Sequence, residues 1–239
     1  MKNNRFLFIT FLLFFYNSTC YAQKSEQLNQ YGLSILNSVS NYKLLVDRDK
    51  GRAMADIRSV IPNVEFDFRY ATTNNFMKQK LYPSIKTTYL RMDALTRLKL
   101  VQSELNSMGL GIKIFDAYRP YGITVKMWEM IHDDRYVADP SKGSGHNRGI
   151  AVDLTIVEVA SQKELDMGTG YDNFTDSAHH SFMQLPPSVM KNRQLLKTLM
   201  EKNGFKIFET EWWHYSLPNA NDYELLNLSF GELKRCSRN

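Results

Sequence analysis

The feature that most constrains this chain is a set of possible metal ligands on two segments far apart in the sequence. The first segment holds His146 and Asp153, and the second, far downstream, holds Glu211 and His214. Two imidazoles and one carboxylate are the protein ligands of many catalytic zinc sites, in which water takes the fourth position. A glutamate three residues before the last histidine is suited to act as the base for that water. If one ion is bound, the two segments must meet in the fold.

The residues around the first segment predict how its two ligands are presented. Residues 150–157 read as a strand, with the apolar even-numbered positions facing a core. Asp153 then lies on the opposite face, which we expect to be free to bind something. His146 has the wrong parity to share an ideal strand with Asp153. We therefore expect it to come from a turn before the strand, which the flanking Gly145 and Gly149 make possible.

The spacing of Glu211 and His214 leaves alternatives open. Residues three apart share a face of a helical turn but not of a straight strand. Either the strand begins only after Trp213, or Glu211 reaches the site from a bend. The simpler interpretation is that Glu211 is a solvated loop carboxylate. Each histidine taken alone is also more simply a surface or core residue without a metal.

Hydrophobic periodicity predicts a mixed fold. Strands are expected at 64–68, 112–114, 150–157 and 205–216, and helices at 91–108, 123–131 and 188–202. Strands and helices do not alternate regularly, so we predict one compact α+β domain with a mainly antiparallel sheet, over residues 61–239. Residues 23–60 are polar and weakly periodic, and we treat them as a weakly determined lead-in.

Residues 1–22 have the pattern of a secretory signal peptide. Two basic residues precede an apolar run from Phe6 to Tyr16, and a cleavage site follows at Ala22. The run is too short to span a bilayer as a helix. We expect an exported, periplasmic protein with no transmembrane span in its mature chain. An uncleaved anchor, a buried first helix and a lipid anchor at Cys20 are the alternatives, although the residues before Cys20 lack the aliphatic side chain that such a site usually has.

Charge and cysteine content narrow the function further. Cleavage would leave Cys236 as the one remaining cysteine, so an internal disulfide is excluded and stability must come from the core. The formal net charge is +5. Because the sequence has no basic cluster with interleaved aromatic residues, this mild surplus does not indicate a nucleic-acid partner.

Other polar residues are also site candidates by residue type. Arg119 follows a predicted strand, where a guanidinium can stabilise an oxyanion or form a structural salt bridge, and position alone does not separate the two. His179 and His180 are adjacent and diverge in a strand or helix, so a loop feature is the simpler interpretation. A serine hydrolase built on Ser144 and His146 would need a nucleophile elbow, and the sequence contains no G-x-S-x-G.

Three motifs, taken together, carry a family resemblance. They are Ser-x-His-x-x-Gly-x-Ala-x-Asp at 144–153, Glu-x-x-His at 211–214, and Asp-Ala-Tyr-Arg-Pro at 116–120. This set resembles the D-alanyl-D-alanine dipeptidases, the zinc family that includes the enzyme of vancomycin resistance, from about Val64 to Tyr215. The resemblance implies a compact α+β fold of the D,D-peptidase and hedgehog type. It also implies one zinc ion per chain, held by His146, Asp153 and His214.

The resemblance also implies roles for the other residues. Glu211 matches the general base, and Arg119 matches the arginine that stabilises the transition state. Asp172 matches the aspartate that binds the free ammonium of the dipeptide. Tyr70 and Ser144 match residues that line the substrate pocket.

The implied function is zinc-dependent hydrolysis of the D-Ala-D-Ala dipeptide. Because the predicted signal directs this chain out of the cytoplasm, we expect a role in salvage during peptidoglycan turnover rather than in resistance. The stretch between Arg119 and Ser144 is shorter than in the resistance enzyme, which affects the expected pocket walls. The alternatives are a zinc D,D-carboxypeptidase acting on peptidoglycan stem peptides, or a non-catalytic zinc-bearing module that binds the wall. Glu211 and Arg119 argue against the module, because a pure binder needs no base.

Overall fold

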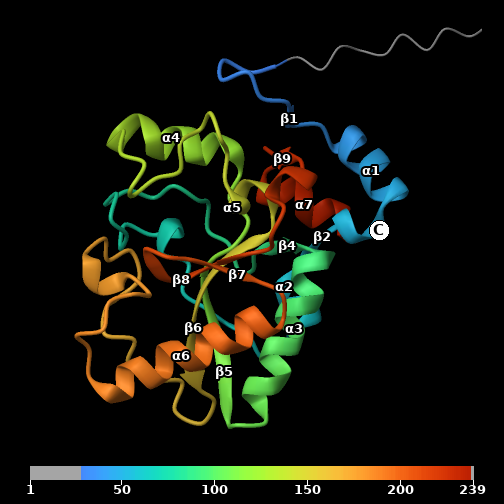
Figure 1. Cartoon of the computed structure of the whole chain (residues 1–239). Helices are drawn as coiled ribbons and strands as arrows, with labels where there is room; N and C mark the ends of the chain where they lie inside the picture. Colours follow the sequence, from blue (N-terminus) through green and yellow to red (C-terminus); the bar gives the residue numbers. More distant parts are fainter. Residues whose placement is uncertain (1–27, 238–239) are drawn as a thin grey trace, which may run out of the picture.

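The fold is organised around a five-stranded sheet in the order β3-β5-β6-β8-β7 (Figure 1). The computed structural model describes residues 28–237, so the predicted signal peptide at 1–22 lies outside the described residues. The strands are β3 (Glu65–Phe66), β5 (Leu110–Asp116), β6 (Ala151–Glu158), β7 (Lys206–Phe208) and β8 (Glu211–Ser216). The β3–β5 pair is parallel and the other pairs are antiparallel. The predicted α+β class with a mainly antiparallel sheet is confirmed.

Two long helices, α3 (Met92–Asn106) and α6 (Pro187–Lys202), pack beside one another against this sheet (Figure 1). The stripe predicted for α3 is buried as expected, with Leu95, Leu98 and Leu105 fully covered. The chain leaves α3 through Gly109, whose φ of +73° glycine adopts without a steric penalty. Burial of this stripe, rather than helix propensity, holds α3 in place.

Two further helices lie at the end of the sheet where β5 finishes and β6 begins. They are α4 (Tyr121–Ile131) and the single turn α5 (Gly145–Arg148). Short 3₁₀ turns lie in the connections between other elements. They are η2 (Arg69–Ala71), η3 (Asp176–Ala178) and η4 (Ala220–Asp222). Within residues 28–237, no helix combines the length and the apolar character that a membrane span requires.

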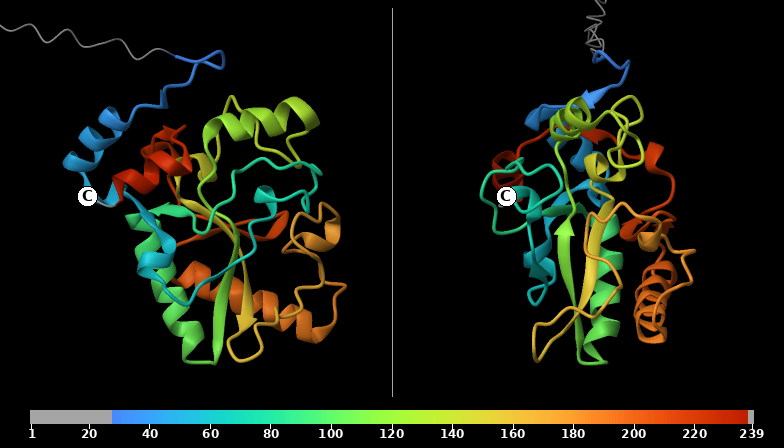
Figure 2. Two further views of the ribbon diagram at one scale, coloured as in Figure 1. Left: turned by 180° about the vertical axis from the view of Figure 1, so that it is seen from behind. Right: turned by 90° about the vertical axis from the view of Figure 1, so that its left-hand side faces the viewer.

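The stretch that we expected to be a weakly determined lead-in contains definite short elements. These are β1 (Ile35–Leu36), α1 (Val39–Arg48), η1 (Lys50–Arg52), β2 (Met54–Asp56) and α2 (Ile57–Val60). β1 pairs with β9 (Leu225–Leu226), β2 pairs with β4 (Tyr89–Arg91), and α1 contacts α7 (Phe230–Cys236) near the end of the chain (Figure 2). Because these short elements pair with segments distant in the sequence, local hydrophobic periodicity gives little indication of them.

Strand β6 is buried on both faces, which corrects one expectation. Ala151, Asp153 and Thr155 are as inaccessible as the apolar residues between them. The reason is that other segments cover the second face: Gly145 of the α5 turn lies against Ala151, and the Tyr171 hydroxyl donates to Asp153. Asp153 therefore does not lie on an open face but at the floor of a cavity described below.

Two β-bulges lie in the sheet beside Asp153. In the β5–β6 pair, Ile114 opposes Leu154 while Asp116 opposes Asp153, so one extra residue is accommodated on β5. Because directly opposed residues share a face, Asp116 lies on the face of Asp153 and not on the core face that simple alternation would give it.

The second bulge resolves the spacing of Glu211 and His214. In the β7–β8 pair, Ile207 opposes Tyr215 but the next residue, Phe208, opposes Glu211. The strand β8 begins at Glu211, so the explanation that it starts only after Trp213 is wrong. The bend is confirmed, and it brings Glu211 to the same side as His214.

Candidate active site

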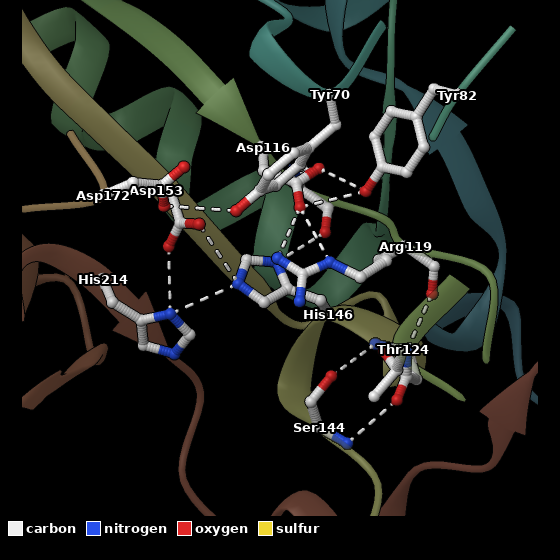
Figure 3. Close-up of polar contacts among 12 residues, drawn as sticks. Tyr70, Tyr82, Asp116, Arg119, Thr124, Ser144, His146, Asp153, Asp172 and His214 are labelled. Carbon is white, nitrogen blue, oxygen red and sulfur yellow. Dashed lines mark hydrogen bonds and ion pairs between the residues drawn. The ribbon is translucent and has the colours of Figure 1, made fainter. Parts of the chain in front are cut away.

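The residues predicted for the site all line one cavity of about 310 Å³. Figure 3 labels all of them except Glu211 and shows them converging from several segments of the chain. The set is Tyr70, Arg119, Ser144, His146, Asp153, Asp172, Glu211 and His214. The cavity volume is at the small end of the range of about 300–1,000 Å³ for ligand pockets. The fold thus assembles the complete predicted set around a space suited to a small ligand.

The three predicted metal ligands lie in mutual contact. Asp153 and His214 are directly opposed on β6 and β8, and Asp153 Oδ1 is 2.9 Å from His214 Nδ1. His146 Nε2 lies 3.2 Å from His214 Nδ1 and 3.4 Å from Asp153 Oδ2. Within residues 28–237, these three form the one group of metal-ligand type whose atoms all lie within 4.8 Å of one another. His179 and His180 do not belong to it.

The donor set fits a divalent metal ion. The Nδ1 of His146 lies 2.7 Å from the carbonyl oxygen of Ala117 and donates to it, which leaves the lone pair of Nε2 directed at the other two ligands. Burial opposes ionisation of Asp153, but the adjacent His146 and His214 lower its pKa below the usual value. A carboxylate anion with two imidazole nitrogens is a ligand set that zinc-type ions prefer.

The predicted turn that carries His146 is the one-turn helix α5. Ser144 caps it: its Oγ accepts the backbone N–H of Asn147, and the Asn147 side chain accepts the N–H of Ser144. Gly149 ends it with a φ of +69°, and a Cβ there would lie 2.5 Å from the sulfur of Met54. Asn147 also donates to the carbonyl of Arg119 at 2.9 Å, so the histidine turn and the arginine loop are held together.

Glu211 lies at the edge of the ligand group. Its Oε2 is 3.9 Å from His214 Nδ1, and the side chain is largely covered. Burial raises the pKa of Glu211 above its ordinary value, and the negative charge of Asp153 adds to this. A carboxylate with a raised pKa is better matched to taking up and releasing a proton near neutral pH.

Arg119 is held by Asp116 at the cavity wall. Its Nε and Nη2 both donate to Asp116 Oδ2, at 3.1 and 2.9 Å, and Tyr82 donates to the same carboxylate. Burial alone would lower the pKa of Arg119, but the carboxylate of Asp116 raises it well above its usual value. The sequence left two roles open for Arg119, a structural salt bridge and stabilisation of an oxyanion. The salt bridge to Asp116 is present, and the guanidinium also faces the cavity as a fixed positive charge.

Asp172 occupies another part of the cavity wall. Its Oδ1 accepts a hydrogen bond from the Tyr70 hydroxyl at 3.1 Å, whereas its Oδ2 is buried and has no hydrogen-bond partner. Burial, together with the charges of Asp153 and Glu211, raises the pKa of Asp172 well above its usual value. Tyr70 also places its ring 5.3 Å from the Arg119 guanidinium carbon. An unpartnered buried carboxylate oxygen is a site for a cationic group.

Sequence reasoning missed several residues that complete the site. Asp116 and Asn147 lie inside the motifs quoted above, and Tyr171 directly precedes the predicted Asp172, so proximity in sequence to predicted residues is a signal that could have found them. Tyr82 has no such signal. Aromatic side chains also form walls of the cavity; they are Phe76, Tyr136, Phe174, Phe208 and Trp213.

Comparisons with known proteins show what the chain is similar to. A family model described as D-ala-D-ala dipeptidase matches residues 50–232. A D-alanyl-D-alanine dipeptidase of Escherichia coli (strain K12) is 35% identical over 72% of this chain and 89% of its own length. One of Enterococcus faecium is 28% identical over 69% of this chain and 92% of its own length. Among solved structures, the LdcB LD-carboxypeptidase matches 67% of this chain and 72% of its own, with 20% identity and a TM-score of 0.38.

Proposed function

Because the chain belongs to the D-ala-D-ala dipeptidase family of metallopeptidases, we propose that it hydrolyses D-Ala-D-Ala with one zinc ion held by His146, Asp153 and His214. The proposal combines the family with the cavity, whose small volume and charged walls suit a short zwitterionic substrate. The observation that carries the substrate assignment is the buried, unpartnered oxygen of Asp172.

Asp172 distinguishes a dipeptidase from a carboxypeptidase. A free dipeptide brings an ammonium group close to its scissile bond, and a carboxylate at that place would bind it. A longer peptide carries an uncharged amide there instead, which would leave the Asp172 carboxylate buried and unpaired at a cost in affinity. Phe174 and Phe76, whose rings contact one another with centroids 5.1 Å apart, line the same cavity.

The protein residues have separable roles in the proposed reaction. Bound zinc would supply Lewis-acid chemistry that activates water and polarises the scissile carbonyl. Glu211 takes a proton from the attacking water and delivers it to the leaving amine as the C–N bond breaks, which releases two molecules of D-Ala. Arg119, held still by Asp116, donates to the carbonyl oxygen as negative charge develops on it.

The test of this function is a comparison of substrates. The purified protein, supplied with Zn²⁺, should cleave D-Ala-D-Ala much faster than L-Ala-L-Ala, and should release little D-Ala from a pentapeptide muropeptide. The measurement is D-Ala release under matched conditions, with the bound metal quantified in the same samples. Faster release from the pentapeptide would reassign the protein as a carboxypeptidase, and zinc binding without any hydrolysis would favour a wall-binding module.

The role of Asp172 predicts a specific pH dependence of dipeptide binding. As the pH falls through the raised pKa of Asp172, the carboxyl group becomes protonated and loses its attraction for the ammonium, so affinity should fall on the acid side. Above about pH 8 the dipeptide amine loses its own proton, and affinity should fall again. Binding is best measured by calorimetry in a Glu211→Gln background, where turnover does not interfere.

The matched variant for this measurement is Asp172→Asn, which keeps the shape of the side chain. It should weaken dipeptide binding by about 10- to 100-fold, as expected for loss of a charge-assisted hydrogen bond of roughly 1.5–3 kcal/mol. It should also flatten the acid side of the binding curve. An Asn variant that kept the wild-type affinity and pH curve would show that the ammonium binds elsewhere.

The proposed place of action is the periplasm. The support is the signal-peptide pattern of residues 1–22. Outside the cytoplasm, the enzyme would meet D-Ala-D-Ala released during peptidoglycan turnover, and its hydrolysis would return D-Ala for salvage. Cell fractionation with an antibody against the mature protein tests this placement, and a cytoplasmic signal would contradict it.

A further inference from the structure

Tyr171 contacts the metal-ligand group without belonging to it. Its hydroxyl lies 3.0 Å from Asp153 Oδ2 and 3.3 Å from the hydroxyl of Tyr70. The residue is 7% exposed. A buried phenol has one proton to donate, so the two contacts compete for it.

The charges decide where that proton goes. A hydrogen bond to an ionised carboxylate is stronger than one to a neutral hydroxyl. Tyr70 directs its own proton at the other carboxylate, with 3.1 Å between its hydroxyl and Asp172 Oδ1. Each tyrosine therefore donates to one carboxylate, Tyr171 to Asp153 and Tyr70 to Asp172. With both phenol protons directed at carboxylates, no proton lies between the two phenol oxygens, which are 3.3 Å apart.

The ring of Tyr171 is fixed on several sides. It stacks on Phe115, the extra residue of the β5 bulge, with ring centroids 4.6 Å apart, and meets Trp213 edge to face at 5.6 Å. The loop that precedes Tyr171 is held by two hydrogen bonds. Trp212 donates to Thr169, and Arg193 donates to the carbonyl of Met167. The hydroxyl is thus presented to Asp153 by a rigid support.

We infer that Tyr171 is a positioning residue that holds one oxygen of Asp153 so that the carboxylate is preorganised to bind the metal ion. This inference rests on the metal site proposed above. Partners that orient a ligating side chain typically contribute about 10- to 100-fold to metal affinity. Tyr171 itself touches neither the ion nor the substrate in this role.

The test is the Zn²⁺ affinity of the metal-free full chain, measured by competition with a chromophoric chelator. Tyr171→Phe keeps the stacked ring and removes the hydroxyl, so it should weaken Zn²⁺ binding by about 10- to 100-fold. At saturating Zn²⁺, kcat should fall while the KM for D-Ala-D-Ala changes little, because Tyr70 still supports Asp172.

The matched control is Tyr42→Phe, which removes a buried hydroxyl on α1 that accepts the N–H of Met54 and does not line the cavity. It should lower thermal stability and leave Zn²⁺ affinity unchanged. Equal Zn²⁺ affinity of Tyr171→Phe and wild type would overturn the inference, as would an equal loss in the Tyr42 variant. Neither result bears on the proposed function, which fails separately if the zinc-loaded wild type does not cleave the dipeptide.

Discussion

Glu211→Gln should lower kcat for D-Ala-D-Ala by about 100- to 10,000-fold, the range that a positioned general base contributes. Gln keeps the shape of the side chain but has no basic oxygen to take the proton from water. Because His146, Asp153 and His214 are untouched, the variant should still bind one zinc ion per chain. Steady-state kinetics and metal analysis on the same preparation check both parts.

The control for this variant is Glu209→Gln. Glu209 is exposed and lies in the turn between β7 and β8, two residues from Glu211. Its substitution removes the same charge from the same hairpin and should leave kcat near the wild-type value. Full activity of Glu211→Gln with normal zinc content would mean that another group activates the water, and the proposed mechanism would be abandoned.

Arg119→Lys should lower kcat by about 100- to 1,000-fold, the typical effect of removing one donor to a developing oxyanion. Lysine keeps the positive charge, but its ammonium cannot reproduce the two donations, from Nε and Nη2, that converge on Asp116 Oδ2 and fix the guanidinium in place. The donor would then no longer be held at the carbonyl oxygen. The KM for the dipeptide should change much less than kcat, because the ammonium is bound by Asp172.

The choice of lysine keeps this test interpretable. Replacing Arg119 by alanine would leave Asp116 buried and unpaired, at a cost of about 3–5 kcal/mol of folding stability, and lost activity could then reflect unfolding. Circular dichroism and zinc content of Arg119→Lys establish that the fold and metal site persist. A well-folded, zinc-bound variant with unchanged kcat would assign Arg119 the structural role alone.

Sequence patterns predicted the local elements that depend on a long hydrophobic period. The stripe of α3, the helix α6 and the strand β6 were placed within a few residues of their observed bounds. The strand predicted at 64–68 forms only the two-residue β3. That strand lies at the edge of the sheet with a single neighbour, β5, and its pairing stops at Ile114, where β5 bulges.

The chemistry of the site was also readable in the sequence. The two histidines and one aspartate suggested a metal site by residue type and spacing, and the family resemblance supplied Asp172 and Tyr70. The structure brings them all to one cavity. What could not be read is how they are held: Ala117 orients His146, Asp116 fixes Arg119, and Tyr171 contacts Asp153.

The sequence by itself determined which groups are available for catalysis and which segments form the main helices and the central strand, because these depend on residue type and on periods of a few residues. Only the tertiary structure decided on which side of the sheet Asp116 and Glu211 lie. Each reaches the site through a β-bulge, and a bulge exists only where a strand pairs with a partner from elsewhere in the chain. The second face of β6 is likewise covered only in the fold, by the loop that carries Tyr171 and contacts Asp153.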